Sequence, residues 1–262
     1  MVRKSQAAAG SDLLFFVCGP QRGKRTIAVL YGFMDASNTH GGARVWCLCG
    51  FLCDEDAFVK LDQSWNRVLD KPTWPTRVKR FHTVECVHQY GQFEKWQFAD
   101  RLAIWGELID VIVSIPIVAL GSVVITEDFA KLSPEELDLL QSEELGDPLA
   151  LSVQYAFRRA ITLTRNTSDS ESIGIAFDDE VPERSEKCHE LCKVYKNKFG
   201  FGKWLAGIGF VSSFTFVPLQ AADLLAYGTY RYVMQRYPDF RESDFPVHPG
   251  FGRLLKEIAT AG

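Results

Sequence analysis

The sequence lacks a charge bias that would identify a partner by itself. Lys and Arg number 29 and Asp and Glu 33, which leaves a formal net charge of −4 in 262 residues. Nucleic-acid binding through bulk positive charge is therefore excluded, and any such contact needs a local basic patch. Three clusters are candidates, although each is equally explained as a solvated helix face: Arg77, Lys79 and Arg80; Arg158, Arg159 and Arg165; and Lys193, Lys196, Lys198 and Lys203.

Long hydrophobic runs and a disulfide framework are also lacking. The apolar stretch DLLFFVCG, residues 12–19, is too short to span a bilayer, and its flanks do not suit a signal peptide. Seven cysteines are an odd number, and the spacing of Cys188 and Cys192 is not that of a zinc knuckle. We therefore expect a reduced, cytoplasmic protein with no membrane partner.

Two common hydrolase signatures are missing. No glycine-rich phosphate loop is present, because GFGKW (200–204) has neither the Walker spacing nor the Ser or Thr that follows the lysine. No Gly-x-Ser-x-Gly elbow occurs either. A hydrophobic content of 47% is ordinary for a globular protein. We expect residues 1–24 to form a loosely ordered extension and residues 25–262 to form a single domain.

The hydrophobic periodicity predicts an α/β fold. Strands are expected at 26–35, 43–53, 77–85, 115–126, 171–178 and 206–216, and helices at 54–70, 95–115, 133–145, 147–166, 183–200 and 218–237. The first two strands are expected to form a hairpin around the turn NTHGG. The natural packing of this order is a central mixed β-sheet flanked by helices on both faces.

Four acidic residues stand at the ends of these elements. Asp35 and Asp178 end strands, Glu85 follows the stretch RVKRFH, and Asp223 lies in the first turns of the last helix. Carboxylates gathered at one end of a sheet repel each other, and a divalent cation removes that repulsion. Two such ions can cleave a phosphodiester. The sequence thus suggests a Mg²⁺ or Mn²⁺ site, although 33 acidic residues allow four such placements by chance.

Two polar residues accompany the carboxylates. His82 stands three residues before Glu85 and could orient a water, a ligand or a leaving group. Gln220 stands three residues before Asp223 and could hydrogen-bond a phosphate or the neighbouring acid. A satisfied, partly buried histidine and an ordinary polar residue of a helix N-terminus are the alternatives.

These stretches together resemble the bacterial and archaeal family called domain of unknown function 3800, an RNase H-like group. The resemblance runs from about residue 27 to residue 235, through YGFMDAS, CGFL, RFHTVECVHQYGQFEKW, IAFDDE and VPLQAADLLAYGTYR. It implies an RNase H-like fold and a metal-dependent nuclease site.

The resemblance also implies which residues form that site. Asp35, Asp178 and Asp223 match family aspartates, and Glu85 stands where the family usually has an aspartate. The residues His82 and Gln220 match a family histidine and glutamine. The chain departs from the family at its first strand, where Asp35-Ala36-Ser37 replaces Asp-Glu-Ser. Neighbouring strand residues face opposite sides, so the metal site can survive this change.

Three functional hypotheses follow. The first is a Mg²⁺- or Mn²⁺-dependent nuclease acting on DNA or RNA, with Phe93, Trp96 and Trp204 as stacking surfaces unless they are core residues. The second is a catalytically impaired scaffold that binds nucleic acid or a partner protein, with a defence or toxin system suggested by the family. The third is a nucleotide hydrolase that uses the same acids.

Overall fold

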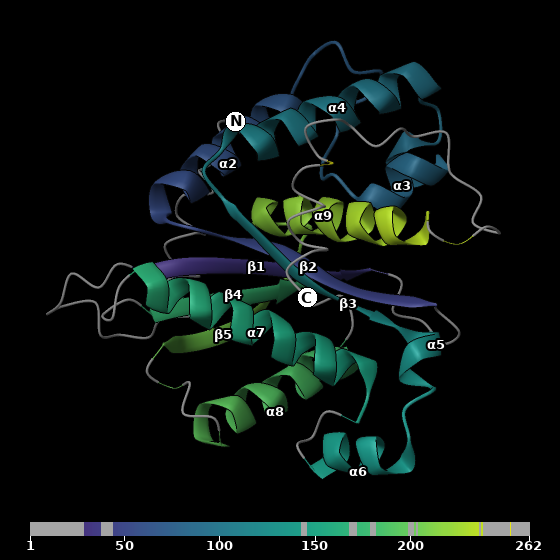
Figure 1. The fold of residues 1–262 in the computed structure, drawn as a ribbon. Helices are drawn as coiled ribbons and strands as arrows, with labels where there is room; N and C mark the ends of the chain where they lie inside the picture. The colour runs from purple at the N-terminus through teal and green to yellow at the C-terminus, as the bar shows by residue number, and fades with distance from the viewer. Residues whose placement is uncertain are drawn as a thin grey trace, which may run out of the picture.

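The computed structural model describes most of the chain after the first 28 residues. The described residues are 29–37, 44–142, 146–167, 172–178, 182–198, 202, 204–235, 237 and 252 (Figure 1). The predicted extension, residues 1–24, lies outside them. Within the described ranges, no helix is both long and apolar enough to cross a membrane.

A five-stranded mixed sheet forms the centre of the molecule, in the order β3-β2-β1-β4-β5. Neighbours pair antiparallel from β3 to β1 and parallel from β1 to β5. The predicted hairpin is therefore confirmed as β1 and β2. The strands are β1 Val29–Ser37, β2 Val45–Cys53, β3 Val118–Ile125, β4 Ser172–Asp178 and β5 Leu205–Val211.

Helices cover both faces of the sheet, as predicted. One face packs against α9, with α2, α3 and α4 beyond it, and the other packs against α7 and α8 (Figure 1). Two apolar cores result, because successive strand residues alternate between the faces. These helices are α2 Glu55–Leu69, α3 Thr83–His88, α4 Phe98–Ser114, α7 Pro148–Thr167, α8 Pro182–Lys198 and α9 Val217–Met234; shorter ones are η1 Gly91–Phe93, α5 Thr126–Phe129 and α6 Pro134–Ser142.

The sequence identifies the long helices to within a few residues because their caps are local. Asp54 precedes α2, and its side chain accepts a hydrogen bond from the backbone N–H of Ala57 at 2.8 Å. Proline stands in the first turn of α9, where it removes no intrahelical hydrogen bond.

The strand predicted at 77–85 is wrong. The segment runs as irregular chain into α3, which begins at Thr83. Three of its backbone N–H groups donate hydrogen bonds to side chains and not to a neighbouring strand. The N–H of Lys79 donates to Gln92, that of Phe81 to Gln220 and that of Thr83 to Asp223, at 3.0, 2.9 and 2.8 Å. The segment therefore lies against η1 and α9 outside the sheet.

Candidate carboxylate site

Asp35 and Asp178 lie on neighbouring strands and on one face of the sheet. The last register pair between β1 and β4 joins Met34 to Phe177, and the next residues along the two strands are Asp35 and Asp178. Parallel strands lie about 4.8 Å apart. Both Met34 and Phe177 belong to the core on the α7 side, and alternation turns the two aspartates to the α9 side. Both are partly buried.

The charge of Asp35 also affects the pKa of a neighbouring thiol, that of Cys49. Asp35 is paired with Cys49 of β2. Burial raises the pKa of the Cys49 thiol to about 12; a hydrogen bond with Thr229 of α9 lowers it, and the charge of Asp35 raises it further. This thiol is protonated at neutral pH and behaves as a packing group.

Asp178 is held by a chain of hydrogen bonds that ends in the core. Its Oδ1 accepts the backbone N–H of Ser213 at 3.3 Å, and the carbonyl of Ser213 accepts Nε2 of Gln220 at 2.9 Å. Oε1 of Gln220 in turn accepts Nε1 of Trp65 at 3.0 Å and the N–H of Phe81 at 2.9 Å. The Gln220 residue is only 2% exposed. It therefore supports the site from inside and does not reach a phosphate.

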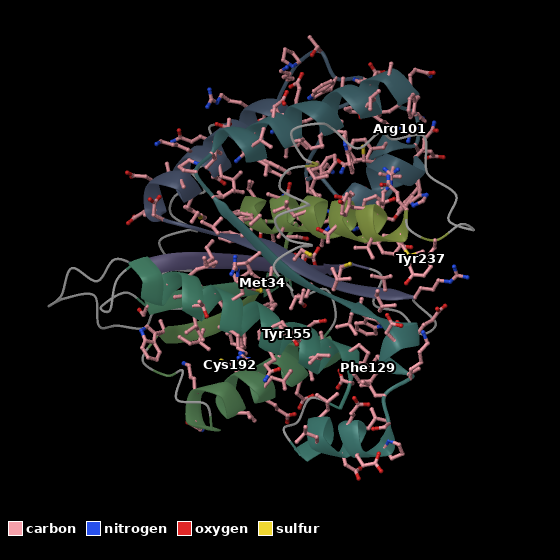
Figure 2. All side chains as sticks on the ribbon, viewed as in Figure 1. Met34, Arg101, Phe129, Tyr155, Cys192 and Tyr237 are labelled. Atoms are coloured by element: carbon pink, nitrogen blue, oxygen red, sulfur yellow. The ribbon has the colours of Figure 1, made fainter. Side chains whose placement is uncertain are left out.

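Asp223 caps the short helix α3 from another helix. Its Oδ2 accepts the N–H of Thr83 at 2.8 Å, whereas the N-cap residue His82 makes no side-chain capping bond. The other end of α3 is held by Arg101 of α4, which lies beside it (Figure 2). Nη1 of Arg101 donates to the carbonyls of Cys86 and Val87 at 2.8 and 2.9 Å. A negative charge thus lies at the N-terminus of α3 and a positive charge at its C-terminus, which the helix dipole favours.

Glu85 and His82 lie within hydrogen-bonding distance of each other. Oε1 of Glu85 lies 3.2 Å from Nδ1 of His82 and 3.4 Å from Nη2 of Arg80. The three side chains are 16%, 24% and 20% exposed. Gly91 lies against the carboxylate of Glu85. Its φ is +60°, and a Cβ there would lie 2.7 Å from Oε2 of Glu85. Glycine adopts this backbone conformation without strain, and its lack of a Cβ leaves room for the Glu85 carboxylate where it lies.

Two parts of the fold position the four predicted ligands. Asp35 and Asp178 stand side by side on the sheet, while Asp223 and Glu85 engage the N-terminal half of α3. Within the ranges that the structure describes, no group of three or more His, Cys, Asp or Glu side chains is placed to hold a metal ion. By donor chemistry, the adjacent aspartates suit Mg²⁺ or Mn²⁺, which prefer carboxylate oxygen. Metal binding by these residues stays a prediction.

The proposed stacking surfaces Phe93 and Trp96 are core residues. Both are 0% exposed, and their rings contact each other at a centroid distance of 5.1 Å. Trp204 is partly buried. Phe214, which sequence reasoning did not single out, is 54% exposed in the turn before α9. Its ring lies under Arg80, 5.4 Å from the guanidinium carbon.

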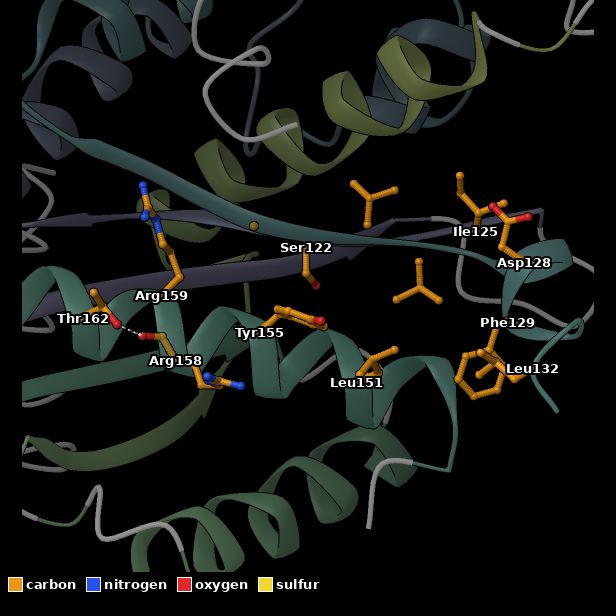
Figure 3. A pocket seen from close by; sticks show the side chains of 13 residues that line it. Ser122, Ile125, Asp128, Phe129, Leu132, Leu151, Tyr155, Arg158, Arg159 and Thr162 are labelled. Carbon is orange, nitrogen blue, oxygen red and sulfur yellow. Dashed lines mark hydrogen bonds between the residues drawn. The ribbon is translucent and has the colours of Figure 1, made fainter. Parts of the chain in front are cut away.

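One basic cluster borders a groove elsewhere on the molecule. A cavity of about 830 Å³ lies between β3, α5 and α7. Figure 3 shows Arg158 and Arg159 at one end and Asp128 and Phe129 at the other, with Tyr155 between them. Its lining includes none of the predicted site residues, so the groove is separate from the carboxylates.

Comparisons with known proteins add a distant structural likeness. No family model and no curated protein matches the sequence. Among solved structures, the chain is similar to a chain in the PCNA:RNase HII complex from Archaeoglobus fulgidus. The identity is 15%, the TM-score is 0.34, and the match covers 89% of this chain and 90% of that chain. The structure itself confirms the predicted α/β architecture, a central mixed sheet flanked by helices on both faces. The RNase H-like assignment stays a prediction.

Proposed function

We propose that the protein is a Mg²⁺- or Mn²⁺-dependent nuclease of the RNase H-like type. The observation that carries this proposal is the register that brings Asp35 and Asp178 together on one face of the sheet. Two partly buried carboxylates at strand separation repel each other, and a cation between them relieves that repulsion. Bound Mg²⁺ or Mn²⁺ would supply an activated water and neutralise charge on the scissile phosphate.

The residues of the site would then have distinct roles. Asp35 and Asp178 would be the principal ligands, with Asp223 and Glu85 completing the acidic site from the side of α3. His82, whose Nδ1 faces Glu85 at 3.2 Å, is oriented by that carboxylate. It would move a proton at the leaving oxygen.

The alternative is a catalytically impaired scaffold that binds nucleic acid or a partner protein. One observation favours it: Asp178, Asp223 and Glu85 take part in hydrogen bonds or ion pairs that stabilise the fold. Asp178 accepts from Ser213, Asp223 from Thr83, and Glu85 faces Arg80. A carboxylate that only holds the chain together needs no metal.

A cleavage assay separates the two proposals. Wild type, Asp178→Asn and Asp223→Asn would be incubated with labelled single- and double-stranded DNA and RNA, in Mg²⁺, Mn²⁺ or EDTA. The matched control is Asp138→Asn, since Asp138 is exposed on α6. The nuclease proposal expects metal-dependent cleavage that both site variants lose and the control keeps. Equal background cleavage in all four proteins would support the scaffold, and Ala36→Glu would then test whether activity can be restored.

A further inference from the structure

The turn between β5 and α9 presents an aromatic ring on a well-held backbone. Phe214 is 54% exposed there. Its N–H donates to Oγ of Ser212 at 3.3 Å, and the N–H of Thr215 donates to the Ser212 carbonyl at 3.1 Å. The residue before it, Ser213, is bound to Asp178. Phe214 therefore directly follows a residue that contacts the carboxylate site.

Arg80 connects this ring to Glu85. Its guanidinium carbon lies 5.4 Å from the centroid of Phe214, within the range of a cation–π contact. Its Nη2 also lies 3.4 Å from Oε1 of Glu85. The side chain is 20% exposed. Arg80 thus places a positive charge between an exposed aromatic ring and the acidic site.

A single-stranded nucleic acid matches this combination. Its phosphate needs a cation to approach a group of carboxylates, and its unpaired bases offer flat faces that stack on aromatic rings and on Arg. A duplex keeps its bases stacked on each other and cannot use such a ring. We propose that Phe214 and Arg80 form a stacking platform that binds a base of single-stranded nucleic acid beside the carboxylate site. This deepens the proposed function, because it names the strand form of the substrate.

Binding without cleavage tests the platform. Fluorescence anisotropy of labelled single-stranded and duplex DNA and RNA would be measured in EDTA for wild type, Phe214→Ala and Phe214→Trp. The matched control is Phe98→Ala, because Phe98 is 41% exposed on α4 and Arg101 lies 5.7 Å from its ring centroid. Base stacking predicts that Phe214→Ala weakens single-strand binding about tenfold or more. Phe214→Trp should restore it, and Phe98→Ala should leave it unchanged.

The outcomes distinguish failure of the platform from failure of the nuclease proposal. If nothing is cleaved in Mg²⁺ or Mn²⁺ but single-strand binding depends on Phe214, the platform stands and the nuclease proposal fails. If Phe214→Ala and wild type bind single strands equally, or if no single strand binds, the platform is overturned, whatever the cleavage assay shows. An equal loss of duplex binding in Phe214→Ala would also overturn it, because stacking on an unpaired base cannot explain that result.

Discussion

Replacing Asp223 by Ala and by Asn separates its structural role from its chemical role. Asp223→Ala removes the 2.8 Å hydrogen bond to the N–H of Thr83 at a partly buried helix N-terminus. The loss of such a cap costs about 1–2 kcal/mol. In a protein of this size that lowers the Tm by about 2–8 °C. Asn keeps an oxygen that can accept the same hydrogen bond, so Asp223→Asn should give a smaller drop.

Thermal unfolding and cleavage would be measured on the same preparations, with Asp138→Ala on α6 as the exposed control. If Asp223 also acts in catalysis, the Asn variant stays folded but loses cleavage. An unchanged Tm in Asp223→Ala would refute the capping argument. An Asn variant as unstable as the Ala variant would show that the charge, and not the accepted hydrogen bond, holds α3. Full cleavage by the Asn variant would leave Asp223 with the capping role alone.

Three further predictions concern the supports of the site and its buried thiols. Gly91→Ala should lower both the Tm and any cleavage, because the new Cβ would lie 2.7 Å from Oε2 of Glu85 at a backbone φ of +60°; wild-type behaviour in both assays would contradict this. Gln220→Leu should cost roughly 3–6 kcal/mol in urea unfolding, because it leaves three buried partners of the amide unsatisfied, and a cost below about 1 kcal/mol would argue against the network. The free energy of unfolding should fall between about pH 9 and pH 11, because burial raises the pKa of Cys49 and Cys86 to about 12, and these thiols stay protonated when folded but ionise when unfolded. Urea titrations at several pH values would check this slope, which Cys49→Ala should reduce and which a flat profile would contradict.

The adjacency of Asp35 and Asp178 shows how far the sequence can lead. Alternation and length locate both strands, and Asp178 ends β4 as predicted. Asp35 does not end β1, because that strand continues to Ser37. Their adjacency depends on β4 joining the sheet next to β1, more than 130 residues away in sequence, and no local pattern encodes that choice. A metal-ligand hypothesis could therefore name the residues but not group them into those on the sheet and those at α3.

The strand prediction for residues 77–85 was wrong for the same reason, because contacts distant in sequence decide the structure of this segment. Its β-branched and aromatic residues favour a strand, but its backbone donors find side chains on distant elements. The bond from Phe81 to Gln220 spans 139 residues, and that from Thr83 to Asp223 spans 140. Once these bonds form, the segment has no donors left at those positions for a sheet neighbour. Tertiary contacts of this kind override propensity and cannot be read from the segment itself.

Exposure of aromatic residues is equally a property of the packed molecule. Phe93 and Phe214 have the same side chain, and each follows a short polar stretch. Phe93 packs against Phe81 at a centroid distance of 6.0 Å and is 0% exposed, whereas Phe214 lies in a turn and is 54% exposed. Sequence reasoning could propose that some aromatic residue contacts a base. It could not choose the residue, because the choice depends on which ring the core encloses.

The helix α3 couples the members of the candidate site to each other. Six residues are too few for an isolated helix to be stable in water, so α3 depends on Asp223 at one end and Arg101 at the other. Glu85 stands on this helix, and its contact with His82 spans one turn. Loss of the Asp223 cap would thus also release Glu85 and His82. An Ala variant at Asp223 that lost cleavage would have two explanations, and only the Asn variant, which preserves the helix, assigns the loss to the carboxylate charge.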